Sequence, residues 1–168
     1  MNYLAEELKH LDLEGYMRAA LAEAERAGQS GELPIGAVIV IDGEIISRAH
    51  ASQQRMHSQI HHAELNAILE GGEPLWRYYR RAILFTTVEP CPLCLGAAVM
   101  ADIPHIIYSL DDQVVMSKLT LAANPYVRRH IRSYQGGVLV RETEAIFRQY
   151  DPLALEYIQT GCAPTPEC

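Results

Sequence analysis

The sequence lacks three features that would place the protein in common classes. Its 168 residues carry 14 lysines and arginines against 21 aspartates and glutamates, so the formal net charge is −7. Nucleic-acid-binding proteins more often show a basic excess. No apolar run approaches the roughly 20 residues of a membrane-spanning helix, and the first twenty residues mix acidic residues among the leucines, unlike a secretory signal. The composition therefore disfavours a nucleic-acid partner, predicts no membrane association and indicates a soluble, cytoplasmic protein.

Cysteine is scarce as well. The four cysteines are Cys91, Cys94, Cys162 and Cys168. They are unlike a disulfide framework, because such frameworks belong to small secreted chains. The last two lie in C-A-P-T-P-E-C, which predicts a flexible C-terminal tail at residues 161–168. The remaining residues, 1–160, have the length of one domain.

The hydrophobic pattern predicts alternating helices and strands. Strands are predicted at Ile35–Ile41, Glu44–Arg48, Ala82–Val88, His105–Ser109 and Val138–Val140. Helices are predicted within Tyr3–Ala27, at His62–Leu69 and Pro92–Met100, in two pieces between Leu110 and Ser133 with a break at Asn124-Pro125, and at Glu142–Tyr150 and Pro152–Thr160. Ala51–Ile60 and the stretch with Pro74 and Trp76 are predicted loops. This order indicates a three-layer α/β/α sandwich with a mixed sheet.

Two short motifs begin two of these helices beside the same sheet. I-H-H-A-E-L-N-A-I contains His62 and Glu64, and E-P-C-P-L-C contains Cys91 and Cys94. At the start of a helix, cysteines three residues apart point to one side, and the helix dipole favours their thiolates. With His62 they form a set of one nitrogen and two sulfur ligands, which suits zinc and leaves one tetrahedral position open for water. Glu64 is then placed to take and return protons at that water.

Each motif alone has other interpretations. Cys-x-x-Cys at this place is also the thioredoxin arrangement, so the pair alone is compatible with a redox, a structural zinc or a catalytic zinc role. A histidine followed two residues later by a glutamate at a helix start is usually solvated. The two motifs together favour catalytic zinc. His61 is expected at the surface or behind the ligands, because a fourth ligand would close the site.

With these residues the chain resembles the cytidine deaminase-like superfamily, whose zinc enzymes share H-x-E…P-C-x-x-C. It is most similar to the branch of tRNA-specific adenosine deaminases and bacterial guanine deaminases. The resemblance covers about Leu33 to Val140, through P-I-G-A-V-I-V, H-A-E and T-T-V-E-P-C-P-L-C-L-G-A. It implies a five-stranded sheet between helices, a homodimer, one Zn²⁺ held by His62, Cys91 and Cys94, and hydrolytic removal of an amino group from a base, with Glu64 as the proton shuttle.

The resemblance also implies where the substrate lies. The backbone of Ala63 would meet the base, and the backbone N–H of Cys91 would help to hold the reacting centre. Glu89, His50 and Gln54 are further candidate substrate-binding residues. Family members carry a base-binding asparagine about eleven residues before the zinc histidine, where gapless counting finds Ala51. A shifted loop would let Gln53 or Gln54 substitute.

Two further departures concern the substrate. The Lys- and Gly-rich segment of tRNA deaminases is replaced by D-D-Q-V-V-M-S-K-L-T, and their basic C-terminal helix is absent. The sequence thus favours a deaminase of a free base or nucleoside, guanine-like or another amino-substituted heterocycle, as in purine metabolism. A tRNA adenosine deaminase is the second hypothesis, followed by a non-enzymatic zinc module and a thiol redox protein. Small basic clusters remain near Arg77–Arg81 and Arg128–Arg132; Arg77, Arg80 and Arg81 could bind phosphate, although a solvated face is the simpler interpretation.

Overall fold

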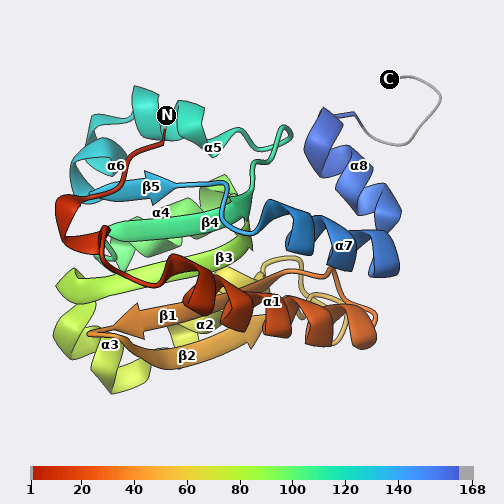
Figure 1. Ribbon diagram of the computed structural model, residues 1–168, viewed down its shortest axis with the longest axis horizontal. Helices are drawn as coiled ribbons and strands as arrows, with labels where there is room; N and C mark the ends of the chain where they lie inside the picture. Colours follow the sequence, from red (N-terminus) through yellow and green to blue (C-terminus); the bar gives the residue numbers. More distant parts are fainter. Residues whose placement is uncertain (1, 163–168) are drawn as a thin grey trace.

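A five-stranded sheet in the order β2-β1-β3-β4-β5 forms the centre of the fold (Figure 1). The structure is a computed structural model and describes residues 2–162. The strands are β1 (Gly36–Ile41), β2 (Glu44–His50), β3 (Ala82–Val88), β4 (His105–Leu110) and β5 (Ser133–Gln135). The helices are η1 (Glu6–Leu8), α1 (Leu13–Gln29), α2 (Ala63–Glu70), α3 (Gly72–Tyr78), η2 (Tyr79–Arg81), α4 (Pro92–Met100), α5 (Ser117–Ala123), α6 (Pro125–His130), α7 (Val140–Tyr150) and α8 (Pro152–Thr160).

The strand directions create two ends of the sheet with different roles. β1 runs antiparallel to β2 and β3, whereas β3, β4 and β5 are parallel. The end of β2, the start of β1 and the ends of β3 and β4 therefore lie together, at what we call the carboxyl end of the sheet. The starts of β3, β4 and β5 lie at the opposite, amino end. In open α/β sheets, ligands bind outside the carboxyl ends of the strands.

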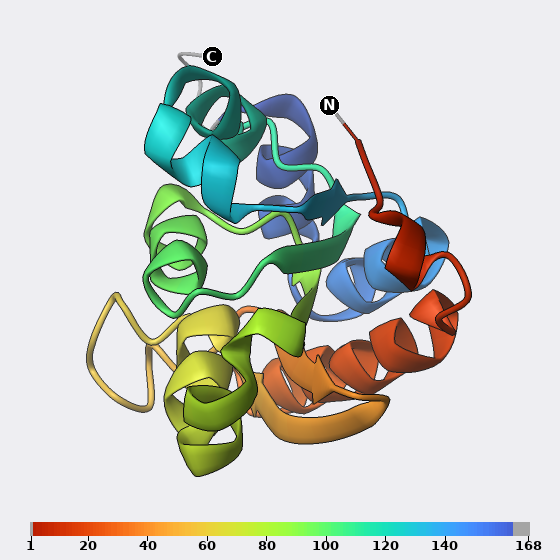
Figure 2. The same ribbon diagram turned by 90° about the vertical axis from the view of Figure 1, so that its left-hand side faces the viewer.

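Helices cover both faces of the sheet, as Figure 2 shows. Alternate residues of β1 face opposite sides, so Ile39 packs in the cluster that includes α2 and α4, while Val38 and Val40 pack against α1. A third cluster joins the ends of β3 and β4 to α7 and α8 through Phe147 and Leu155. It fixes α8 at the carboxyl end of the sheet.

A close approach between α1 and β1 depends on Gly36. A Cβ atom at this position would lie 2.1 Å from the Ala20 carbonyl oxygen and 2.4 Å from the Ala24 nitrogen. Because these are backbone atoms, no side chain could move aside to make room. The glycine of P-I-G-A-V-I-V thus sets how closely α1 packs on the start of β1, next to the carboxyl end of the sheet.

The structure confirms the three-layer α/β/α architecture with a five-stranded mixed sheet and corrects several elements. The stretch with Pro74 and Trp76 is helix α3 and not a loop, because Pro74 lies in its first turn, where a missing N–H costs nothing. The strand predicted at Val138–Val140 is wrong: the fifth strand is β5, and Val140 already begins α7. Val138 and Leu139 instead pack as loop residues on the α1 side of the core.

Two other expectations concern the ends of the chain and membranes. The predicted tail at 161–168 falls outside the described residues from 163 onward, and Gly161 ends α8 in a left-handed conformation with φ of 73°. Across residues 2–162 we find no helix with the length and hydrophobicity required to traverse a bilayer.

Candidate metal centre and active-site cavity

Three potential metal ligands meet where α2 and α4 begin, at the carboxyl end of the sheet. His62 is the N-cap residue of α2, Cys91 is the N-cap residue of α4, and Cys94 lies one turn into α4. The Nδ1 atom of His62 is 3.4 Å from the sulfur of Cys91 and 3.4 Å from the sulfur of Cys94. Within residues 2–162, this is the one group of three such side chains whose ligand atoms lie within 4.8 Å of one another.

The geometry fits a tetrahedral zinc ion. Zn–S bonds of about 2.3 Å and Zn–N bonds of about 2.0 Å at tetrahedral angles separate the ligand atoms by about 3.5 Å. The observed separations of 3.4 Å between His62 and each cysteine sulfur agree with this value. Two thiolates and an imidazole are also the donors that favour zinc over magnesium or calcium. His62, Cys91 and Cys94 are therefore positioned to bind one zinc ion.

Hydrogen bonds between the ligand side chains shift their pKa values and favour the charged forms of Cys91 and His62. The hydrogen bond from Cys94 and contact with His62 lower the pKa of the half-buried Cys91 thiol to about 4. The same Cys91–Cys94 bond raises the pKa of Cys94, which keeps its proton, and a hydrogen bond to Cys91 raises the pKa of His62. Metal binding displaces such protons because only thiolates and neutral imidazoles are ligands.

Glu64 lies beside the ligands and is almost wholly buried, with 4% of its surface exposed. Its Oε2 atom is 3.4 Å from the sulfur of Cys94. Burial raises the pKa of this carboxyl group above its ordinary value, because a charged form loses hydration there. A carboxyl group with a raised pKa next to a metal position can both accept and release a proton near neutral pH.

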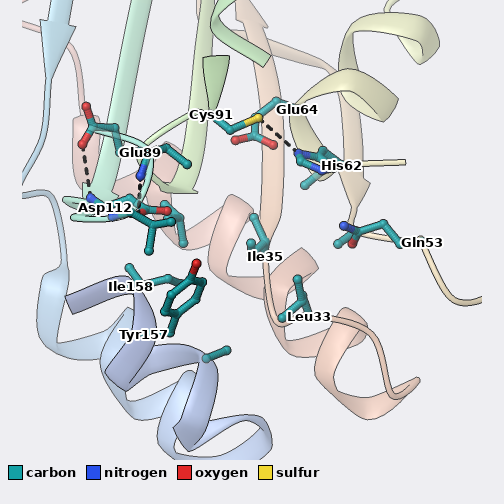
Figure 3. A pocket seen from close by; sticks show the side chains of 16 residues that line it. Leu33, Ile35, Gln53, His62, Glu64, Glu89, Cys91, Asp112, Tyr157 and Ile158 are labelled. Carbon is teal, nitrogen blue, oxygen red and sulfur yellow. Dashed lines mark hydrogen bonds between the residues drawn. The ribbon is translucent and has the colours of Figure 1, made fainter. Parts of the chain in front are cut away.

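A cavity of about 300 Å³ opens in front of Glu64, His62 and Cys91 (Figure 3). In Figure 3, Tyr157 and Ile158 of α8 lie across the cavity from the metal ligands. The segments that enter β1 and follow β2, β3 and β4 contribute Leu33, Ile35, Ala51, Gln53, Glu89, Asp112, Val114 and Val115. Ala63 of α2, Val88 of β3 and Ala154 of α8 complete the wall. Most of these side chains are apolar, so the cavity suits a planar ring.

The structure separates the predicted substrate-binding residues into two groups. Ala63 and Cys91 line the cavity, as the resemblance implies. His50 and Gln54 do not line it. His50 ends β2 and its Nδ1 atom lies 3.2 Å from a Glu23 carboxylate oxygen. The backbone N–H of Gln54 donates to Glu32 at 2.9 Å, which turns the loop so that Gln53 is the glutamine beside the cavity.

Glu89 lines the cavity and also holds part of its wall in place. Its carboxylate borders the cavity but accepts hydrogen bonds from the backbone N–H groups of Asp112 and Lys118, at 3.2 and 3.1 Å, and from the hydroxyl of Tyr134 at 3.1 Å. Burial raises the pKa of this carboxyl group. Glu89 thereby holds both ends of the segment that contributes Val114 and Val115 to the cavity wall.

Asn66 is a supporting residue that the sequence did not reveal. Its amide nitrogen donates to the carbonyl of His50 at 2.9 Å and to the hydroxyl of Ser52 at 3.0 Å, and its amide oxygen is 3.0 Å from the Nδ1 atom of His61. His61 is thus held behind the metal ligands, as expected, and not among them. The only sequence signal is that Asn66 lies one helical turn after His62.

Fold and site together define a class: an α/β protein with a histidine–cysteine–cysteine metal centre and a buried glutamate beside it, the arrangement of zinc-dependent deaminases. Residues 11–110 match the family described as "Cytidine and deoxycytidylate deaminase zinc-binding region". The chain belongs to this deaminase family. The expected zinc cofactor is confirmed at this level.

A curated relative and two solved structures refine the relationship. The tRNA-specific adenosine deaminase of Streptococcus pyogenes serotype M18 is 47% identical over 100 residues, which cover 58% of this chain and 62% of the relative. A solved tRNA:A34 deaminase is 32% identical with a TM-score of 0.70 and covers 79% of this chain and 98% of its own. The guanine deaminase of Nitrosomonas europaea, at 15% identity and a TM-score of 0.67, covers 89% of this chain and 86% of its own and shares the fold. The chain spans about three fifths of the length of the first curated relatives it matches.

These comparisons overturn the favoured substrate. Curated relatives with 37 to 47% identity are named tRNA-specific adenosine deaminases, so the assignment to a free base or nucleoside is wrong, and the second hypothesis has the better support. A net charge of −7 does not decide against an RNA partner, because it averages over the whole surface, whereas an RNA contacts only part of a protein's surface.

Proposed function

We propose that the protein deaminates adenosine within tRNA, converting it to inosine. Water replaces the amino group on the purine ring, and ammonia leaves, so that adenosine and water become inosine and ammonia. The observation that carries the proposal is the position of buried Glu64 between the three metal ligands and an apolar cavity of about 300 Å³. The names of the relatives support the choice of tRNA adenosine over other amino-substituted bases.

Zinc held by His62, Cys91 and Cys94 would supply activation of water, lowering its pKa from 15.7 toward about 7. Glu64 performs the proton transfers: its carboxylate accepts a proton from the attacking water, gives it to the adjacent ring nitrogen, and then assists protonation of the departing amine. The low-dielectric surroundings that raise the pKa of Glu64 also strengthen its hydrogen bond to the reacting atoms.

The cavity walls would hold the base by stacking and by its edges. The ring of Tyr157 lies across the cavity from the metal ligands, where it can stack on a base that has been turned out of the RNA. Gln53 offers the amide beside the cavity, and the backbone N–H of Ala63 at the start of α2 is a further donor there. Of the two glutamines that a shifted loop would let substitute for the family's asparagine, Gln53 is the one beside the cavity.

Inosine formation against a substrate panel tests the proposal. The panel contains a tRNA with adenosine at the first anticodon position, the same tRNA with guanosine there, the isolated anticodon stem-loop, free adenosine and free guanine. We expect ammonia release from the tRNA and the stem-loop with adenosine at the first anticodon position, and at least a hundredfold lower kcat/KM for the other substrates. Release from guanine with none from tRNA would contradict the proposed substrate.

A homodimer is the second part of the proposal. Helices α2, α3 and α4 present an apolar hollow with strongly exposed side chains: Leu69 is 68%, Trp76 82% and Met100 74% exposed. Exposed apolar groups gathered in this way are typical of a protein–protein interface, and a self-complementary contact closes as a dimer. Sedimentation equilibrium should give twice the chain mass for the wild type and the chain mass for Trp76→Glu. A wild-type monomer at micromolar concentration would contradict the proposed homodimer.

The cytoplasmic location of the protein stays a prediction.

A further inference from the structure

Arginine is concentrated at the amino end of the sheet, opposite to the metal centre. Six of the 14 lysines and arginines fall within residues 77–81 and 128–132. We call these six the arginine surface: Arg77, Arg80, Arg81, Arg128, Arg129 and Arg132, all of which are exposed. We propose that this surface binds the phosphate backbone of the tRNA outside the anticodon loop. This inference rests on the proposed function.

A hollow of about 300 Å³ brings the two segments together. Arg80 lines it from the segment before β3, and Arg129 and Arg132 line it from the segment before β5, with Tyr79, Asp102, Pro104 and His130 completing the wall. Three arginines and one carboxylate, that of Asp102, therefore line the hollow, and Glu7 outside it pairs with Arg132. Because the chain is acidic overall, this local excess of positive charge has the opposite sign to the net charge of the protein.

Two arginines of the hollow are free to bind an anion. Arg80 and Arg129 form no ion pair with a carboxylate anywhere in residues 2–162, the part of the chain that the structure describes. Their guanidinium groups lie over aromatic rings instead, Arg80 at 5.8 Å from the centroid of Tyr79 and Arg129 at 4.9 Å from that of Tyr126. Such stacking leaves the N–H donors at the guanidinium edge available for phosphate oxygens.

The other arginines do not contradict this reading. Arg77 pairs with Glu73, Arg81 with Asp42 and Arg132 with Glu7, at 2.7, 2.9 and 2.5 Å. The side chains in all three pairs are between 45% and 69% exposed. Exposed ion pairs of this kind contribute little and are screened by salt, so a phosphate can replace the carboxylate.

The position of the surface indicates which part of the RNA it meets. Strands β3 and β4 have seven and six residues and separate the arginine surface from the metal centre by about 20 Å. One RNA can therefore place a nucleotide at the metal centre and a distant phosphate at the arginine surface of the same protomer. Alternatively, it can contact the metal centre of one protomer and the arginine surface of the other. A short anticodon stem-loop reaches the surface less well than a whole tRNA does.

Charge removal tests the inference on the zinc-loaded full-length protein. The variant Arg80→Gln/Arg129→Gln removes the two arginines of the hollow that form no ion pair within residues 2–162 and keeps the side chains long. The matched control Arg18→Gln/Arg148→Gln removes two equally exposed arginines from α1 and α7, on the other face of the sheet. Equilibrium binding is measured to a whole tRNA with guanosine at the first anticodon position, and to the anticodon stem-loop, from 50 to 300 mM salt.

We expect the arginine variant to bind whole tRNA about tenfold more weakly near 0.1 M salt, with the slope of log affinity against log salt reduced by about 1.5. The loss should be several times larger for whole tRNA than for the stem-loop, and the control should bind as the wild type does. Equal tRNA affinities for the arginine variant and the control would overturn the inference. If the wild type forms no inosine in any RNA, the proposed function fails separately, and the binding data alone judge the surface.

Discussion

The two ends of the sheet hold hollows of equal volume, about 300 Å³ each, with opposite surroundings. At the carboxyl end the carboxyl group of Glu64 is buried beside apolar groups and metal ligands, and Glu89 is buried in the same cavity wall. At the amino end three arginine side chains are exposed to solvent. The comparison shows that burial and not size decides what a hollow can do: a desolvated charge has an altered pKa and suits proton transfer, whereas hydrated charges supply affinity that salt weakens.

Loss of a metal ligand should give the largest effect at the carboxyl end. Cys94→Ala removes a fully buried sulfur of the metal centre, so we expect zinc content to fall from about one to near zero per chain after dialysis, with deamination below detection. Metal analysis and inosine formation are the measurements. Cys162→Ala, at an exposed position outside the cavity, should retain zinc and activity. Full zinc content in Cys94→Ala would remove that residue from the centre.

Glu64→Gln should separate the chemistry from metal binding. We expect kcat to fall by about 10²- to 10⁴-fold, the usual contribution of general acid–base catalysis, with zinc retained. Affinity for tRNA should change less than it does in Arg80→Gln/Arg129→Gln, because the amino end supplies affinity. Glu70→Gln, on the exposed end of the same helix, is the matched control. A Glu64→Gln enzyme with near-normal kcat would refute the proton-transfer role.

Glu89→Gln should affect substrate binding more than turnover. The amide presents N–H groups where the carboxylate accepts from Asp112 and Lys118, so the cavity wall loosens and KM should rise about tenfold, the equivalent of one lost charge-assisted hydrogen bond. Faster amide hydrogen exchange at 112–118 should accompany it. Asp111→Asn, which alters the ion pair with Lys118 and the hydrogen bond from the Tyr108 hydroxyl but none of the hydrogen bonds to Glu89, should change KM little. A fall in kcat with unchanged KM would argue against this role.

Tyr157 should give the smallest of these effects. The ring is 38% exposed at the cavity mouth, so replacing it by leucine should raise KM about fivefold, near the lower limit for the loss of one base–aromatic stack. Tyr157→Phe keeps the ring and should behave as the wild type. If phenylalanine and leucine raise KM equally, the hydroxyl and not stacking matters. Steady-state kinetics on the anticodon stem-loop separate these outcomes.

The metal centre could be predicted from the sequence because its geometry is local. Cys91 and Cys94 are one helical turn apart, and His62 and Glu64 share the start of another helix, so spacing alone orients each pair. The strands from Ile35 to His105 could also be predicted, since buried apolar runs of this length have few alternatives. The substrate could not be predicted, because two absent tRNA-deaminase features and the net charge outweighed the resemblance to tRNA deaminases, which the names of the relatives support.

By itself the sequence determined the fold class, which follows from the order of helices and strands, and the metal ligands with the neighbouring carboxylate, which follow from spacing within two helix starts. Tertiary structure decided the rest: which glutamine borders the cavity, that Glu89 braces its wall, and that Arg80 meets Arg129 across one hollow. These facts depend on the packing of segments up to 49 positions apart in the chain. A one-dimensional pattern does not encode such distances, because they are set by the pairing of strands and the cores beneath them.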